Sequence, residues 1–404
     1  MKNGINVKAL IGIFAYAISA QANNLTSGIL AYMMMTYSEV SQTTVSMVMT
    51  VPAIVGTVFA FISGNIMNKV GSKKMLLFIH GSLFISGMIF LFFGNKTSVY
   101  VLWLAAAFYG FLLGGSTVVL GQLFVDNISD IEKRGTFYGY ACSVMSLGGV
   151  FFASIGGAIA AANGGAHWER AYYLYFLILV CLIIEFICIP DKKPQPEIPA
   201  SSKEKKDKSA DKLPLKVWLI AINYGFFFLF LYAFSLNLSE YVITTHSLGT
   251  SVEAGLGISF LTVGGIISGV CFGWYSKLLR KWTVPFMMAL VAVGYAITVF
   301  IPNIIMLYIA GGLLGFAMMG CSPYIISEFS RITTPKSYPK AMSIFSGLMN
   351  VGMMVAVYVL AFLAGLFAGD STSVDGKLFI AFVGVILVFV TAIPIYTGKG
   401  VRKS

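Results

Sequence analysis

The sequence predicts an all-α integral membrane protein with twelve transmembrane helices in two pseudo-symmetric six-helix bundles. Three observations predict this class. The composition is 58% hydrophobic and 11% charged, with a mean hydropathy of +0.85, far more apolar than a soluble domain needs. Twelve apolar runs are close to the length of about 20 residues that spans a bilayer. Finally, 24 of the 27 Lys and Arg residues occupy one alternate set of the connections between these runs.

The candidate spans follow one another along the whole chain. In order they cover residues 9–34, 40–67, 75–94, 98–124, 135–162, 168–189, 214–243, 252–276, 283–301, 303–328, 340–367 and 375–397. The first run is too long, and too polar in its middle, for a cleaved signal peptide. Gln21, Asn23 and Asn24 lie where the apolar region of such a peptide belongs. We therefore expect this run to remain in the mature protein as the first span.

The distribution of positive charge predicts the orientation. Basic residues gather near both termini and in every second loop, whereas the opposite face keeps only Lys96, Arg170 and Lys377. Basic loops stay in the cytoplasm, so we expect both termini there and the spans in a plasma membrane. The net charge of +11 then reflects topology and attraction to anionic lipid headgroups, not nucleic-acid binding. The lack of an organelle presequence and of long external loops favours a prokaryotic protein.

A polar segment divides the spans six and six. Residues 190–213 hold four prolines and then alternate Lys with acidic residues, a composition typical of a flexible linker that cannot bury a core. The expected domains are an N-terminal bundle, residues 1–189, and a C-terminal bundle, residues 214–404, joined by this cytoplasmic linker.

The two halves also repeat at an offset of 202 residues. The repeated positions are an acid, a base and a glycine: Asp126 and Glu328, Arg134 and Lys336, and Gly110 and Gly312. A six-plus-six duplication creates a cavity between two bundles that can rock about a midplane site. This is the architecture of a secondary transporter.

Two loop motifs carry a family resemblance. The second span is followed by Gly64-x-x-x-Asn68-Lys69-x-Gly71-Ser72-Lys73-Lys74, and the fourth by Glu132-Lys133-Arg134-Gly135 with Gly139. Both resemble cytoplasmic loop signatures of the major facilitator superfamily, and with the twelve spans and the central loop the resemblance covers essentially the whole chain. It implies alternating-access transport with spans one, four, seven and ten lining the cavity.

The resemblance also implies a latch at the cytoplasmic gate. The expected latch residues are Gly64, Asn68, Lys69, Gly71, Lys73, Asp126, Arg134, Glu328 and Lys336. We expect Lys69 to meet Asp126, with Arg134 nearby, and each exposed pair to contribute about 0 to 1 kcal/mol. The alternative is that these charges only mark the membrane boundary. Asn68 stands where the family usually has an acid, which removes about 0.3–1 kcal/mol of helix-dipole stabilisation and makes the outward-facing state less favoured.

Neutral polar side chains near the middle of the spans are the candidates for substrate contact, because each is costly in lipid without a partner. Gln21 and Asn24 lie three residues apart and share a helix face. The full candidate set is Gln21, Asn24, Tyr109, Ser116, Tyr232, Asn237, Ser322, Tyr324 and Asn350. Amides, phenols and hydroxyls suit a small neutral, zwitterionic or monoanionic solute. The alternative for each residue is a hydrogen bond between helices.

Ionisable residues inside the spans are few. No Lys or Arg lies near the middle of any span, so a dianionic substrate is not expected. Glu240, near the outer end of the seventh span, is the candidate for carrying a coupling proton or meeting a cationic substrate, and the alternative is an acid solvated at the interface. We expect Glu185 to reach cytoplasmic water and His80 to be packed or water-reaching.

Other chemistry is not indicated. The five cysteines lack paired spacing and the three histidines form no cluster, so neither a disulfide framework nor a metal site is predicted. The sequence holds no phosphate-binding loop and no catalytic motif. We therefore expect no cofactor and no enzyme activity. The expected partners are a small-molecule substrate, a coupled proton or cation and the lipid bilayer, with the chain monomeric.

The leading function is alternating-access transport of a small organic solute, by symport or facilitated diffusion. The first alternative is a proton-coupled antiporter that exports drugs or metabolites. Against it, Ala106 stands where such exporters of the family usually carry Arg, and the glycine-rich fifth span lacks their Gly-Pro pair. An alternative of another class is a non-transporting receptor or scaffold on the same fold.

Overall fold

The computed structural model describes residues 5–191, 213–249 and 251–398. These residues are helical apart from short connections and one isolated bridge between Ile5 and Ile128. The chain forms two compact units. The first comprises Met1–Ile131, Val144–Leu213 and Thr333–Gly347, and the second comprises Glu132–Ser143, Pro214–Ile332 and Leu348–Ser404. The predicted linker, residues 190–213, lies almost wholly outside the described residues.

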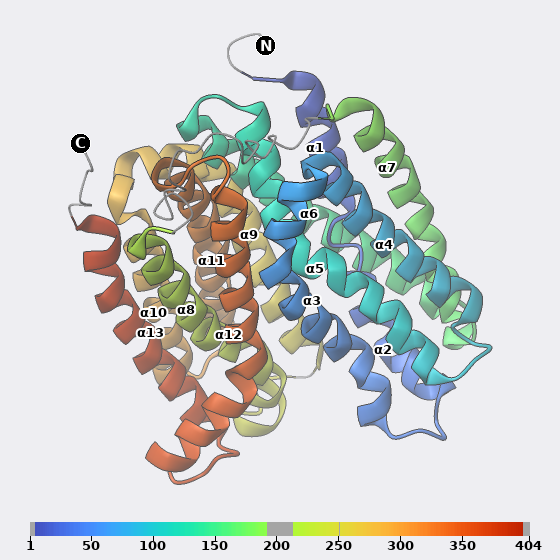
Figure 1. The fold of residues 1–404 in the computed structure, drawn as a ribbon. Helices are drawn as coiled ribbons and strands as arrows, with labels where there is room; N and C mark the ends of the chain where they lie inside the picture. The colour runs from blue at the N-terminus through green and yellow to red at the C-terminus, as the bar shows by residue number, and fades with distance from the viewer. Residues whose placement is uncertain (1–4, 192–212, 250, 399–404) are drawn as a thin grey trace. The chain divides into compact units, whose positions relative to one another are not determined.

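The N-terminal half supplies seven α-helices and two short 3₁₀ helices (Figure 1). The α-helices are α1 Val7–Ser19, α2 Asn24–Thr36, α3 Gln42–Val70, α4 Ser72–Phe93, α5 Val99–Asn127, α6 Ile131–Ala161 and α7 Phe176–Cys188. The 3₁₀ helices, Ala162–Gly165 and Trp168–Tyr175, lie between α6 and α7. The sixth predicted span therefore begins as a 3₁₀ helix and continues as α7.

The C-terminal half supplies six α-helices. They are α8 Leu215–Glu240, α9 Ser251–Leu279, α10 Thr283–Phe300, α11 Ile304–Ile332, α12 Tyr338–Phe367 and α13 Val374–Thr397. A π-helical turn, Tyr241–Thr245, extends α8, and a 3₁₀ turn, Arg280–Trp282, joins α9 to α10. The expected domain boundaries differ from the two units by residues 132–143 and 333–347, because α6 and α12 each begin against helices from the other half of the sequence.

The described helices confirm a multi-pass membrane protein. Ten helical stretches among the described residues are long and apolar enough to cross a membrane. One of these stretches, Glu253–Phe300, holds both α9 and α10. The first predicted span is missing from the ten because it consists of two helices of 13 residues each. The expectation of one continuous helix over residues 9–34 is therefore wrong, and each of the other predicted spans coincides with helical structure.

The break in the first span has a local cause. Between α1 and α2 the backbone bonds three residues back instead of four: Ala22 N–H donates to the Ser19 carbonyl at 3.0 Å, and Asn24 N–H to the Gln21 carbonyl at 3.0 Å. The Asn23 carboxamide oxygen accepts a hydrogen bond from the Thr26 hydroxyl at 3.1 Å. Short amide side chains compete for backbone partners in this way and favour turns and helix ends.

The two units repeat one packing scheme. In the first unit α3 packs on α5, α4 on α5 and α1 on α7, and in the second unit α9 packs on α11, α10 on α11 and α8 on α13. Glycines permit the closest approaches. A Cβ on Gly114 of α5 would lie 2.2 Å from the Gly56 carbonyl of α3, and one on Gly315 of α11 would lie 1.7 Å from the Leu261 carbonyl of α9. Small residues at such crossings are typical of membrane helices.

Candidate functional site

The broken first span brings Gln21 and Asn24 together. Both side chains face Gly149 of α6, where an added Cβ would lie 2.9 Å from the Gln21 Oε1 atom and 2.5 Å from the Asn24 Nδ2 atom. Gln21 is half-buried and Asn24 is exposed. The predicted shared face is thus produced by the turn, and the two amides stand at a helix break inside an apolar bundle. Broken helices at this depth are where many carriers bind their substrates.

Two further candidates lie beside this break in the first unit. Ser116 and Tyr109 of α5 are half-buried and lie near the side chain of Tyr16 on α1. The Tyr16 hydroxyl is itself fully buried and lacks a hydrogen-bond partner at normal geometry. Tyr172 adds a phenol on the other side of the break, where its hydroxyl and that of Thr26 are 2.8 Å apart. The first unit therefore holds a row of neutral polar groups from α1, α2 and α5.

In the second unit, two of the candidate side chains already have hydrogen-bond partners. Ser322 of α11 shares a hydrogen bond of 2.8 Å with the Tyr224 hydroxyl of α8. Asn237 is buried and donates to the Ala233 carbonyl of its own helix at 2.8 Å, so this amide is already satisfied. Asn350 of α12 is buried as well, and its Nδ2 atom has no hydrogen-bond partner among the described residues. Tyr232 is exposed on α8. Asn350 Nδ2 and the Oδ1 atom of Asn223 on α8 are therefore the buried amide atoms of this unit that lack a partner among the described residues.

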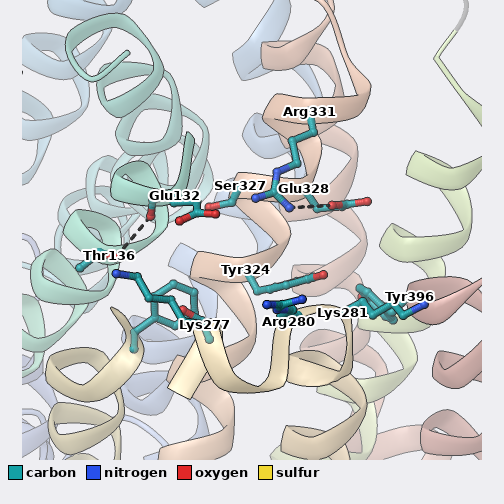
Figure 2. A pocket seen from close by; sticks show the side chains of 12 residues that line it. Glu132, Thr136, Lys277, Arg280, Lys281, Tyr324, Ser327, Glu328, Arg331 and Tyr396 are labelled. Carbon is teal, nitrogen blue, oxygen red and sulfur yellow. Dashed lines mark hydrogen bonds and ion pairs between the residues drawn. The ribbon is translucent and has the colours of Figure 1, made fainter. Parts of the chain in front are cut away.

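Tyr324 belongs to a separate pocket. A pocket of about 740 Å³ in the second unit is lined by Tyr324 and Tyr396 together with ionic side chains from α6, α9, the 3₁₀ turn Arg280–Trp282 and α11 (Figure 2). The ionic lining residues are Glu132, Lys277, Arg280, Lys281, Glu328 and Arg331. Four of the six are basic. Glu328 pairs with Arg331 at 3.8 Å, as the dashed line in Figure 2 marks, and with Lys216 at 2.5 Å. The structure thus places Tyr324 among charges near the basic end of α9 and α11.

The expected latch residues adopt contacts of their own. Asp126 accepts hydrogen bonds from the Ser72 hydroxyl at 2.7 Å and from the Gln122 amide at 2.8 Å, while the Lys69 side chain is exposed. Lys73 donates to the Phe186 carbonyl at 2.7 Å. In this structure Asp126 bonds residues of α4 and α5. The pairing of Lys69 with Asp126 stays a prediction.

Segment 333–347 packs on α3 within the first unit. The Asn68 amide donates to the Lys336 carbonyl at 3.3 Å, and the Gly64 N–H donates to the Ser343 hydroxyl at 2.6 Å. A carboxylate at position 68 has no hydrogen to donate to this carbonyl, so the departure from the family pattern creates a contact. Gly71 has a φ of 89°, which its turn requires, whereas Gly64 is needed for close approach: a Cβ there would lie 2.3 Å from the Pro339 carbonyl.

Glu240 and Glu185 lie in opposite environments, one exposed and one fully buried. Glu240 ends α8, is exposed, and makes no ion pair with the other described residues. Glu185 is fully buried, so the expectation that it reaches water is wrong. Its Oε1 atom lies 2.6 Å from His80 Nδ1, and His80 Nε2 lies 3.0 Å from the Ser19 hydroxyl. The rarity of acids inside spans is the one signal in the sequence that points to this cluster.

The chain matches the sequence model of the Major Facilitator Superfamily over residues 12–248 and 220–400. Among curated proteins it is similar to the choline/ethanolamine transporter FLVCR1 of Mus musculus, with 30% identity over 179 residues, and to that of Felis catus, with 28% over 178 residues. Each of these alignments covers 42% of this chain and 31% of the relative, so the match spans less than a third of the relatives' length.

Solved structures resemble the whole chain. FucP, crystallised in the outward conformation, superposes with a TM-score of 0.73 at 14% identity, covering 96% of this chain and 97% of its own. A bacterial homologue of the iron transporter ferroportin gives 0.73 at 15% identity, covering 98% and 100%. The proton:xylose symporter XylE gives 0.72 at 13% identity, covering 96% and 95%. At such identities the likeness shows the fold alone.

Proposed function

Because the chain belongs to the Major Facilitator Superfamily, we propose that it is a secondary carrier that moves a small organic solute across a membrane by alternating access. The observation that carries this proposal is the polar break in the first span, where Gln21 and Asn24 meet at Gly149 of α6. Irregular backbone at membrane depth is tolerated where it lines a cavity, since its polar groups need partners there. A substrate supplies such partners.

The side chains around the break favour a substrate with hydrogen-bonding groups and low net charge. Amides and hydroxyls from α1, α2 and α5 carry no formal charge, and the middle of the spans holds no Lys or Arg. A neutral, zwitterionic or monoanionic solute fits this lining. In the second unit, the buried Nδ2 atom of Asn350 has no partner among the described residues and is free to bind a solute.

A small amino alcohol is the second candidate. The similarity to FLVCR1, named as a choline/ethanolamine transporter, favours it over part of the chain. Tyr109 of α5 is a half-buried phenol near Tyr16, and aromatic faces attract quaternary ammonium groups. Choline and ethanolamine therefore join neutral sugars and amino acids as the first solutes to test.

Residues 333–347 belong to the first unit and residues 132–143 to the second, and these segments are candidates for a gate. Asn68 and Gly64 hold residues 333–347 in the first unit, and Ser143 donates to the Ile266 carbonyl at 2.8 Å in the second. We propose that these hydrogen bonds, with the expected latch residues, form and break as access alternates. The carrier would work as a monomer in a plasma membrane, with residues 1–189 and 214–404 as its bundles and both termini cytoplasmic.

Solute counterflow tests the proposal. Purified protein in liposomes preloaded with one unlabelled solute at a time should take up the same labelled solute faster than protein-free liposomes. Uptake confined to bulky lipophilic cations against a proton gradient would favour the efflux antiporter instead. A properly folded protein that moves none of the solutes in either direction would contradict a carrier function and favour a receptor or scaffold.

A further inference from the structure

Three buried side chains form a continuous polar chain across the first unit. Ser19 of α1, His80 of α4 and Glu185 of α7 each have 0% of their surface exposed. The Ser19 hydroxyl lies 3.0 Å from His80 Nε2, and His80 Nδ1 lies 2.6 Å from Glu185 Oε1. The second carboxylate oxygen of Glu185 is buried without a hydrogen-bond partner among the described residues. Burying an acid and an imidazole together is costly unless protons and hydrogen bonds are matched.

Two protonation states fit the same heavy-atom positions. In the first, one proton lies between His80 Nδ1 and Glu185 Oε1, the Nε2–H donates to Ser19, and the Ser19 hydroxyl donates to the Ala15 carbonyl, 3.5 Å away. The net charge is then zero. In the second, the Nδ1–H donates to an ionised Glu185 and the Ser19 hydroxyl turns to donate to Nε2. The net charge is then −1, so the two states differ by one proton.

Among the described residues, no ion pair with a basic side chain fixes this balance. His80 and Glu185 form no ion pair with any Lys or Arg among the described residues. Tyr16 on α1 lies edge-on to His80 with 5.2 Å between the ring centroids, and Cys181 on α7 lies near Ser19 and Glu185. Lys73 of α4 donates to the carbonyl of Phe186, the residue next to Glu185, at 2.7 Å and makes no ion pair with the Glu185 carboxylate. Phenols and thiols are neutral at physiological pH. The charge of the cluster is therefore set by the proton that His80 and Glu185 share.

The corresponding junction of the second unit is tied by neutral groups. There the Asn223 amide of α8 donates to the Val388 carbonyl at 3.1 Å and to the Thr391 hydroxyl at 3.0 Å, both on α13. The pair α8 and α13 is the counterpart of α1 and α7. A mechanical tie between these helices thus needs no ionisable residue, and the imidazole and carboxylate of the first unit supply a capacity that the amide lacks.

One member of the cluster, Ser19, lies at the break between α1 and α2. Ser19 is the last residue of α1, and the Ser19 carbonyl accepts the first turn bond from Ala22. Turning the Ser19 hydroxyl from the Ala15 carbonyl to His80 changes the bonding of the helix end two residues before Gln21. The Ser19 hydroxyl thus changes partner with the protonation state and, at the same time, changes the bonding of the helix end. Coupling between two sites requires such a two-state element that both sites influence.

We propose that Ser19, His80 and Glu185 form the proton-binding site of this carrier, and that its occupancy sets the conformation of the break at Ala20–Asn23. The proposal rests on the proposed transport function for its role in coupling, but the binding of the proton and the response of the break do not depend on a solute. Glu185 and His80 bind the proton, and Ser19 is a positioning residue.

Two solute-free measurements test the proposal on the full-length protein. Infrared difference spectra between pH 5 and pH 8 should show a protonated carboxyl group that disappears in Glu185→Gln. Hydrogen exchange of the backbone at residues 19–26, corrected for the chemical rate, should change between these pH values by at least about fivefold, the low end of usual site-to-site coupling. Glu185→Gln should abolish this change.

A surface pair supplies the matched control. His167 and Glu169 lie 3.3 Å apart in the same unit, but 49% of the His167 side chain is exposed. Glu169→Gln should keep both the carboxyl signal and the pH response of the break. Ser19→Ala should keep the carboxyl signal and lose the response of the break. Ser19→Ala removes only one hydroxyl group and is therefore expected to fold. It tests the proposal even if Glu185→Gln does not fold.

An exchange response that is the same in wild type, Glu185→Gln and Ser19→Ala would overturn the proposal, whether or not the protein transports a solute. With a transported solute such as choline in hand, Glu185→Gln should retain counterflow and lose accumulation driven by a proton gradient. If the wild type shows counterflow with none of the solutes tested, the transport function is refuted, and the solute-free results alone decide the proton site.

Discussion

Gly148 of α6 gives the sharpest test of the packing that holds the break in place. A Cβ added there would lie 1.8 Å from the Ile18 carbonyl oxygen of α1 and 2.8 Å from its carbonyl carbon. Contacts below 3.0 Å to backbone atoms cannot be relieved by turning a side chain. In Gly148→Ala the two helices must therefore move apart just before the turn that begins at Ala20.

The magnitude follows from a control on the same helix. Gly157, also on α6, has nothing within 4 Å of an added Cβ. Both alanines gain the same helix propensity, up to about 1 kcal/mol, so this gain cancels between the two variants. Overpacking costs about 1–3 kcal/mol and affects only Gly148→Ala. The free energies of unfolding of the two variants should differ by that amount, with Gly157→Ala the more stable.

Denaturant titration of both variants in one detergent measures this difference, and their melting temperatures should follow the same order. Counterflow by Gly148→Ala should fall as well, because the displaced Ile18 adjoins the break. Equal stability of the two variants would refute the close approach of α1 to α6, and with it the positions assigned to Gln21 and Asn24.

Other residues give further tests. In Gly149→Ala the new methyl group displaces the two amides of the break, and the loss of one hydrogen bond, about 0.5–1.5 kcal/mol, should weaken solute binding roughly 2- to 12-fold in a direct binding assay. Lys216→Ala leaves the partly buried Glu328 with Arg331 at 3.8 Å alone, so the free energy of unfolding should fall by about 1–2 kcal/mol in a denaturant titration. Glu240→Gln changes an exposed acid without an ion pair among the described residues, so the pH profile of transport should not move.

Most of the fold could be predicted because runs of apolar residues mark membrane helices and the positive charge of the loops indicates their orientation. α13 matches the expected span at residues 375–397 almost residue for residue. The first span was misread as continuous because a span is recognised by its mean hydropathy, which tolerates a short polar turn. Asn23 and Asn24 were the local signal for the break, since asparagine disfavours helix interiors.

The candidate site was less predictable, because contacts between distant residues leave little trace in a single sequence. His80 and Glu185 are separated by more than 100 residues, and no pattern in either span predicts their contact. Asn237 looked like a cavity residue, yet its amide bonds the Ala233 carbonyl one turn earlier. Tyr324 stays a predicted substrate residue, and the basic side chains that line its pocket could not be inferred from its span number. Side-chain direction decided each of these cases.

Solute affinity of Gln21→Ala tests the central claim most directly. Once counterflow has identified a transported solute, its affinity should be measured for wild type, Gln21→Ala and the control Ser27→Ala, whose exposed hydroxyl bonds only the Asn24 carbonyl of its own turn. Binding at the break predicts a loss of roughly 2- to 12-fold in Gln21→Ala, the worth of one hydrogen bond, and unchanged affinity in Ser27→Ala. Wild-type affinity in Gln21→Ala would place the solute elsewhere and contradict the account.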